Sequence, residues 1–181
     1  MRHGNESLKA GHIENTISKK IGLAYDLQSR YSQMLLKDEK IKTLLLQLDK
    51  NIEATLKEME LIGLVKECSD CALNGGGSCC GTGMEKNYDS VLLFINLMLV
   101  KTLPSEYYDP HSCYFLSGQG CVLRARQVIC VNYLCQRIYK NIHQDKLIRL
   151  QEIAGEELHT LFILQEYIKK KISLTQKINK P

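Results

Sequence analysis

Apolar residues recur at helical spacing along most of the chain. The first such stretch begins at Ile13 and ends near Lys37, and the second runs from Ile41 to Gly63, with charged residues off the apolar stripe. Steps of three and four residues place side chains on one face of an α-helix. The pattern therefore predicts two amphipathic helices, which we expect to pair as an antiparallel hairpin over residues 13–66.

Three more helices are predicted in the rest of the chain. Residues 85–103 are apolar all round, which is typical of a buried helix, and Pro104 would end it. Residues 127–142 form the fourth predicted helix. A fifth, amphipathic helix covers residues 145–172. The pattern therefore predicts an all-α fold, a helical bundle of about five helices.

Two segments without this periodicity, residues 68–83 and 102–123, separate the predicted helices and hold most of the cysteines. We expect them to be irregular loops that frame one site. With 181 residues, the chain has the usual size of one domain. We therefore treat residues 1–181 as a single domain with a cysteine-cluster region at 68–135 and a C-terminal helix and tail at 136–181.

Composition and charge argue against nucleic acid as a partner of this chain and against a membrane span. The 24 basic and 20 acidic residues leave a net charge of +4, too small an excess to predict nucleic-acid binding. The first twelve residues lack the apolar core of a signal peptide. The longest apolar stretch, Val91 to Val100, is short of the roughly 20 residues that cross a bilayer. We expect a cytoplasmic protein without a membrane span.

The eight cysteines are the unusual feature of the composition. In a reducing compartment they are expected to bind metal rather than to form four structural disulfides. Thiolates select zinc, copper(I) or iron–sulfur clusters over hard cations. Irregular spacing favours an iron–sulfur cluster over zinc, which usually sits between two CxxC pairs. The candidate ligands fall into two groups of four along the sequence: Cys68, Cys71, Cys79, Cys80, and Cys113, Cys121, Cys130, Cys135.

The order and surroundings of these cysteines carry a resemblance to a known family. The CxxC and CC pairs are followed by Cys113-Tyr114-Phe115-Leu116, by Gly120-Cys121-Val122-Leu123, and by Arg126-x3-Cys130-x2-Tyr133-x-Cys135. This combination resembles the YkgJ-type cysteine-cluster family of zinc- or iron-chelating proteins, to which the cysteine region of flagellin lysine N-methylase is similar. The resemblance implies that all eight cysteines are metal ligands. It covers residues 68–135 and leaves the flanking helices unassigned.

The other candidate features are weaker. His111 stands two residues before Cys113 and could add an imidazole ligand, although a loop histidine is the simpler interpretation. The adjacent pair Cys79 and Cys80 is expected to serve two centres or one large assembly, because neighbouring side chains diverge. The glycines at 75–77 would let the backbone turn closely around a cluster. No catalytic residue is assigned.

The sequence thus predicts a metal-binding protein, first of all an iron–sulfur protein with a 4Fe–4S type or larger cluster, acting in electron transfer or redox sensing with a protein partner. One alternative is a zinc-stapled interaction module without redox chemistry. A further alternative is a small-molecule redox enzyme that uses the cluster. The N-terminal helices offer a surface for homo-oligomer formation.

Overall fold

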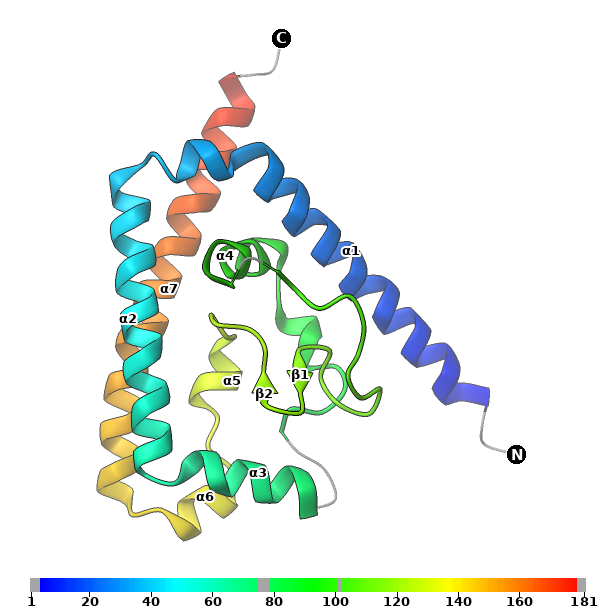
Figure 1. Cartoon of the computed structure of the whole chain (residues 1–181), viewed down its shortest axis with the longest axis vertical. Coiled ribbons are helices and arrows are strands. Elements are labelled where there is room, and N and C mark those ends of the chain that lie inside the picture. Colours follow the sequence, from blue (N-terminus) through cyan, green and yellow to red (C-terminus); the bar gives the residue numbers. More distant parts are fainter. Residues whose placement is uncertain (1–3, 75–78, 101, 179–181) are drawn as a thin grey trace. The chain divides into compact units, whose positions relative to one another are not determined.

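The all-α fold is confirmed. A computed structural model describes residues 4–74, 79–100 and 102–178, with side chains for 17–71, 79–100 and 102–176. Its elements are, in chain order, α1 (Gly4–Leu35), α2 (Glu39–Leu61), α3 (Leu64–Asn74), the 3-10 helix η1 (Met84–Asn87), α4 (Ser90–Val100), β1 (Leu116–Ser117), β2 (Gly120–Cys121), α5 (Val128–Asn132), α6 (Gln136–Asn141) and α7 (Gln144–Ile178). Figure 1 shows their course along the chain.

The chain divides into two compact units, each made of two segments. We call residues 1–33 with 80–124 the α1–α4 unit, and residues 34–79 with 125–181 the α2–α7 unit. The boundary in the middle of the cysteine region falls between Cys79 and Cys80. The cysteines are therefore distributed over both units.

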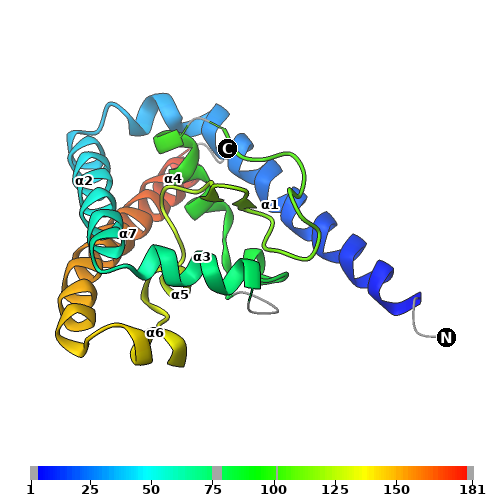
Figure 2. The ribbon, with the colours of Figure 1, turned by 60° about the horizontal axis from the view of Figure 1, so that its bottom comes forward.

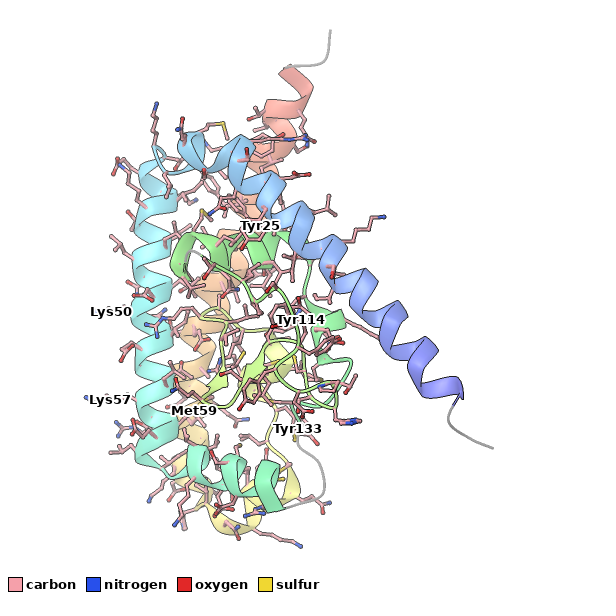
Figure 3. The ribbon with its side chains drawn as sticks, turned by 45° about the vertical axis from the view of Figure 1, so that its right-hand side comes forward. Tyr25, Lys50, Lys57, Met59, Tyr114 and Tyr133 are labelled. Atoms are coloured by element: carbon pink, nitrogen blue, oxygen red, sulfur yellow. The ribbon has the colours of Figure 1, made fainter. Side chains whose placement is uncertain are left out.

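Helices α2 and α7 form the framework of the α2–α7 unit. They lie side by side in Figures 1 and 2 and share the most extensive contact between elements. The apolar stripe predicted for α2 is buried at Ile41, Leu48 and Ile52, while Figure 3 shows Lys50 and Lys57 on the outer side of the helix. The buried face of α2 is thus covered by α7, and the hairpin expected between the first two helices stays a prediction.

Polar contacts fix the register of α2 against α7. The Asn51 amide donates to the Glu156 carbonyl at 3.1 Å and to the Thr160 hydroxyl at 3.0 Å. At the start of α2, the Asp38 carboxylate caps the helix and forms an ion pair with Lys171 at 2.7 Å. These contacts are far apart along the helix axes, so sliding of one helix past the other would break both.

One hydrophobic cluster anchors the short helices that carry cysteines. Its buried members come from α2, α3, α5, α6, α7 and the residues next to them: Met59, Ile62, Leu64, Val131, Ile138, Ile142, Leu147, Leu150 and Ala154. Leu134 and Cys135 pack against the same cluster. Helix α3 contributes Leu64, α5 contributes Val131 and α6 contributes Ile138. The cluster therefore fixes all three helices on one end of the α2–α7 framework.

The α1–α4 unit has its own apolar core. Residues 92–97 of α4 are buried without interruption, as expected for a helix that is apolar all round. Aromatic rings extend this core. The ring centroid of Phe115 lies 5.0 Å from that of Tyr88 and 5.4 Å from that of Tyr114. The Leu103 N–H donates to the Tyr25 hydroxyl of α1 at 3.2 Å. Both Cys113 and Tyr114 are buried here, so the core fixes the segment that holds Cys113.

Three local predictions need correction. Residues 68–74 are not irregular but belong to α3, which begins directly after Gly63, where the backbone has φ +83° and ends the preceding helix. The fourth predicted helix is two short helices, because Tyr133 and Cys135 are extended. The third begins as a 3-10 turn, and among the described residues of the predicted 85–103 the α-helix covers 90–100.

Within the described residues, none of the helices combines the length and the apolar character needed to cross a membrane.

Candidate metal centre

Three cysteines of the α2–α7 unit lie on or next to α3 and α6, two helices that contact each other. Cys71 lies on α3, Cys79 follows that helix in the chain, and Cys135 is the residue that caps α6. The thiols of Cys135 and Cys71 both interact electrostatically with that of Cys79. We call Cys71, Cys79 and Cys135 the α3–α6 thiol group.

The surroundings of Cys79 disfavour its thiolate form. Desolvation raises the pKa of the Cys79 thiol above its ordinary value, and the nearby thiols of Cys135 and Cys71 raise that pKa further. The first cause disfavours any thiolate with protein packed against it, and the second reflects repulsion between like charges. Both causes favour the protonated form of Cys79, and a bound cation would offset them.

An ion pair holds α3 against α6 beside these thiols. The Glu67 carboxylate accepts from the Arg137 guanidinium at 2.9 Å and from the Asn141 amide at 2.8 Å. Glu67 raises the pKa of Arg137, and the neighbouring Cys71 contributes in the same direction. Arg137 is thus a fixed positive charge near Cys71. It would stabilise negative charge on the α3–α6 thiol group.

Acid should weaken this clamp. Arg137 and then Asn141 hold the pKa of Glu67 below its ordinary value of 4.5. A lowered carboxylate pKa stabilises the fold fully above pH 4.5, and the stabilisation is lost as the pH falls through the lowered pKa. We expect Glu67→Gln to lower the free energy of unfolding at neutral pH and the deficit to shrink below pH 4.5. Urea unfolding measured across this pH range checks the expectation.

Glu60→Gln is the matched control for that experiment, because Glu60 is an exposed carboxylate on the neighbouring α2. It should leave the free energy of unfolding close to that of the wild type at each pH. A deficit for Glu67→Gln that stays constant over the whole pH range would contradict an ionic clamp.

The cysteines of the α1–α4 unit lie on a short antiparallel arrangement of backbone. Gly81 pairs with Ser112 in an isolated bridge, and the Cys113 N–H donates to the Cys80 carbonyl at 2.8 Å. In this register Cys80 stands opposite Cys113, with Cα atoms about 5.5 Å apart by standard antiparallel geometry. Cys121 lies on β2, opposite Leu116 of β1.

The spatial grouping of the cysteines differs from their grouping along the sequence. Cys79 lies with Cys71 and Cys135, which come from different sequence groups, and Cys80 lies opposite Cys113. Cys79 and Cys80 belong to different units, and their service of two centres or of one large assembly stays a prediction. Cys68 is three residues before Cys71 on α3, hence on the same side of that helix. Cys130 lies on α5, next to the buried Val131.

A fixed turn precedes Cys113 and carries His111. Both oxygens of the Asp109 carboxylate accept hydrogen bonds, one from the Ser112 hydroxyl at 2.6 Å and one from the His111 N–H at 3.0 Å. Ser112 first, and then His111, hold the pKa of Asp109 below its ordinary value. The His111 side chain is exposed. The structure thus gives the His111 backbone a role in the turn, and its imidazole remains a candidate ligand only.

Among the side chains described, those of residues 17–71, 79–100 and 102–176, no group of three or more His, Cys, Asp or Glu could hold a metal ion as it stands. The glycines at 75–77, expected to turn around a cluster, lie outside the described residues. The cysteine sulfurs are donors that suit a thiophilic metal. Their side chains would have to move closer together to coordinate it.

Sequence reasoning missed the role of Glu67. It stands directly before Cys68, and its partner Arg137 stands two residues after Cys135. A carboxylate and a guanidinium that flank cysteines from the two sequence groups are a signal of proximity. This signal emerges only when the residues that flank the first sequence group of cysteines are compared with those that flank the second.

No protein-family model, curated protein or solved structure matches the chain.

Proposed function

We propose that this chain is a metal-binding protein that holds an iron–sulfur cluster of 4Fe–4S type or larger and exchanges electrons with, or reports redox state to, a protein partner. The eight cysteines in their observed order are its ligands, as the resemblance to the YkgJ-type cysteine-cluster family implies. The site operates in the cytoplasm in this proposal. No catalytic residue is part of it.

One observation carries the proposal above the others. Desolvation and the nearby thiols of Cys135 and Cys71 raise the pKa of the Cys79 thiol, so Cys79 favours its protonated form unless a cation is bound. A structural fold has no need for such crowding, since one apolar side chain would fill the same space without a hydrogen-bonding group. A thiophilic metal would be favoured by closely spaced thiols, because metal binding releases the thiol protons and replaces repulsion between thiolates with coordination.

Two features support iron–sulfur chemistry over zinc. The cysteine spacing has one CxxC pair instead of the two that a zinc knuckle uses. Arg137 beside Cys71 supplies a positive charge, and charge close to a cluster is one of the factors that set reduction potential.

Anaerobic purification tests this proposal. We expect the full chain to carry iron together with acid-labile sulfide, to be brown, and to lose broad visible absorbance on reduction with dithionite. Stoichiometric zinc without sulfide or colour would contradict the iron–sulfur assignment and support a zinc-stapled module. A purified chain with neither metal, and with unchanged folding after chelation, would overturn the metal function altogether.

A further inference from the structure

Lysines gather where residues 34–42, at the start of α2, meet residues 166–176 of α7. Both segments belong to the α2–α7 unit. The ion pair between Asp38 and Lys171 at 2.7 Å joins them, although they are distant in the sequence. We call the lysines of the two segments the lysine patch: Lys37, Lys40, Lys42, Lys169, Lys170 and Lys171.

The lysine patch carries an excess of positive charge that the net charge of the chain does not reveal. Its two segments hold six lysines and three acidic residues, which leaves a local charge of +3. Each of the three carboxylates already pairs with one lysine of the patch. The three lysines outside these pairs are exposed: Lys37, Lys40 and Lys170. The patch therefore attracts an anionic surface.

Exposed apolar side chains lie beside the same lysines. Met34 is 37% exposed, Leu36 43% and Leu174 48%. The Thr175 hydroxyl donates to the Met34 sulfur at 3.5 Å, so Met34 lies next to the part of α7 that carries Leu174. Apolar side chains surrounded by lysines are typical of protein surfaces that lie in the headgroup layer of a membrane with anionic lipids.

The composition of the patch favours lipid over nucleic acid. Its two segments contain no arginine, the residue best suited to bidentate contacts with phosphates and bases. Their one aromatic residue is Tyr167. The ammonium nitrogens of Lys40 and Lys171 lie 4.6 Å and 5.3 Å from the centre of its ring. Because lysines already occupy the ring, it is poorly placed to stack on a base.

We propose that the lysine patch holds the chain reversibly at an anionic lipid surface. The lysine ammonium groups contact the headgroup phosphates, and the side chains of Met34, Leu36 and Leu174 enter the layer below them. This goes beyond the proposed function, which involves no membrane. It requires no membrane-spanning helix, because a surface of this kind binds in the plane of the interface.

Vesicle sedimentation with the full chain tests the proposal. At low salt we expect the chain to sediment with vesicles of phosphatidylcholine mixed with phosphatidylglycerol and to remain in solution with vesicles of phosphatidylcholine alone. Raising the salt concentration should release the bound chain, because ions screen the attraction between the lysines and the headgroups. Equal binding to both kinds of vesicle, or no binding to the anionic vesicles at low salt, would overturn the proposal.

Charge reversals locate the binding surface. Lys37→Glu combined with Lys170→Glu should lower the bound fraction several-fold. The matched control combines Lys50→Glu with Lys57→Glu, which changes the net charge equally on the outer side of α2 (Figure 3). It should bind nearly as well as the wild type. Equal losses in the two variants would mean that only the total charge matters, and this would contradict a lysine patch.

An apolar substitution separates insertion from simple charge attraction. Leu174→Ser leaves the charge unchanged and should weaken binding to the anionic vesicles, whereas Leu46→Ser, at a 75% exposed position elsewhere on α2, should not. Circular dichroism of every variant checks that the helices remain. Equal effects of the two serine substitutions would contradict insertion of Leu174.

A DNA duplex provides the competing polyanion. At the same ionic strength, fluorescence polarisation should show weaker binding to the duplex than to the anionic vesicles. Tighter binding to the duplex, lost in the Lys37→Glu and Lys170→Glu variant, would overturn the proposal in favour of nucleic acid. Metal content does not enter these measurements, so the proposed function and this inference can fail independently.

Discussion

Ile138→Ala should destabilise the α2–α7 unit by about 2–5 kcal/mol, the usual cost of removing most of a buried isoleucine side chain. Ile138 is 3% exposed and belongs to the hydrophobic cluster against which Cys135 packs. The cavity would therefore loosen α6, the helix that Cys135 caps. Urea unfolding measures the loss of stability, and thiol labelling under native conditions should show faster modification of Cys135.

Ile148→Ala provides the control with the same chemistry. Ile148 lies on α7 and is 47% exposed, so its truncation should change the free energy of unfolding by only about 0.5 kcal/mol or less. Equal effects of the two substitutions would mean that the hydrophobic cluster does not anchor α6.

Loss of any member of the α3–α6 thiol group should have the largest effect on metal content. Cys71→Ser, Cys79→Ser and Cys135→Ser each replace a soft donor with a hydroxyl, a much poorer ligand for iron or zinc. We expect each variant, purified without oxygen, to hold clearly less metal per chain than the wild type. Elemental analysis together with the visible spectrum measures the loss.

Ser69→Ala is a suitable control, because Ser69 is exposed on α3 between two of the cysteines. It should leave the metal content unchanged. A Cys79→Ser variant with wild-type metal content and spectrum would show that Cys79 is not a ligand. The proposed role of the α3–α6 thiol group in metal binding would then be wrong.

The long helices could be predicted from the sequence because their apolar residues follow a single period over many turns. The predicted second helix, Ile41 to Gly63, differs from α2 by only about two residues at either end. Periodicity shows which face of a helix is buried, but it does not show what covers that face. For that reason the pairing of α2 with α7 could not be predicted from the two stripes alone.

The cysteine region was less predictable for two physical reasons. The break between α5 and α6 has no proline or glycine to mark it, and it follows from tertiary packing that buries both Val131 and Ile138. The short helix α3 precedes a glycine run, so local composition suggested a loop. Spacing alone also cannot show that Cys79 and Cys80 belong to different units, because that division depends on contacts with residues far along the chain.

X-ray absorption at the iron and zinc edges of the anaerobically purified chain is the most direct test of the metal centre. The account predicts iron with a first shell of sulfur atoms and a second shell of iron, which together define an iron–sulfur cluster held by thiolates. A first shell of oxygen and nitrogen atoms around the metal, or the absence of both edges, would contradict it.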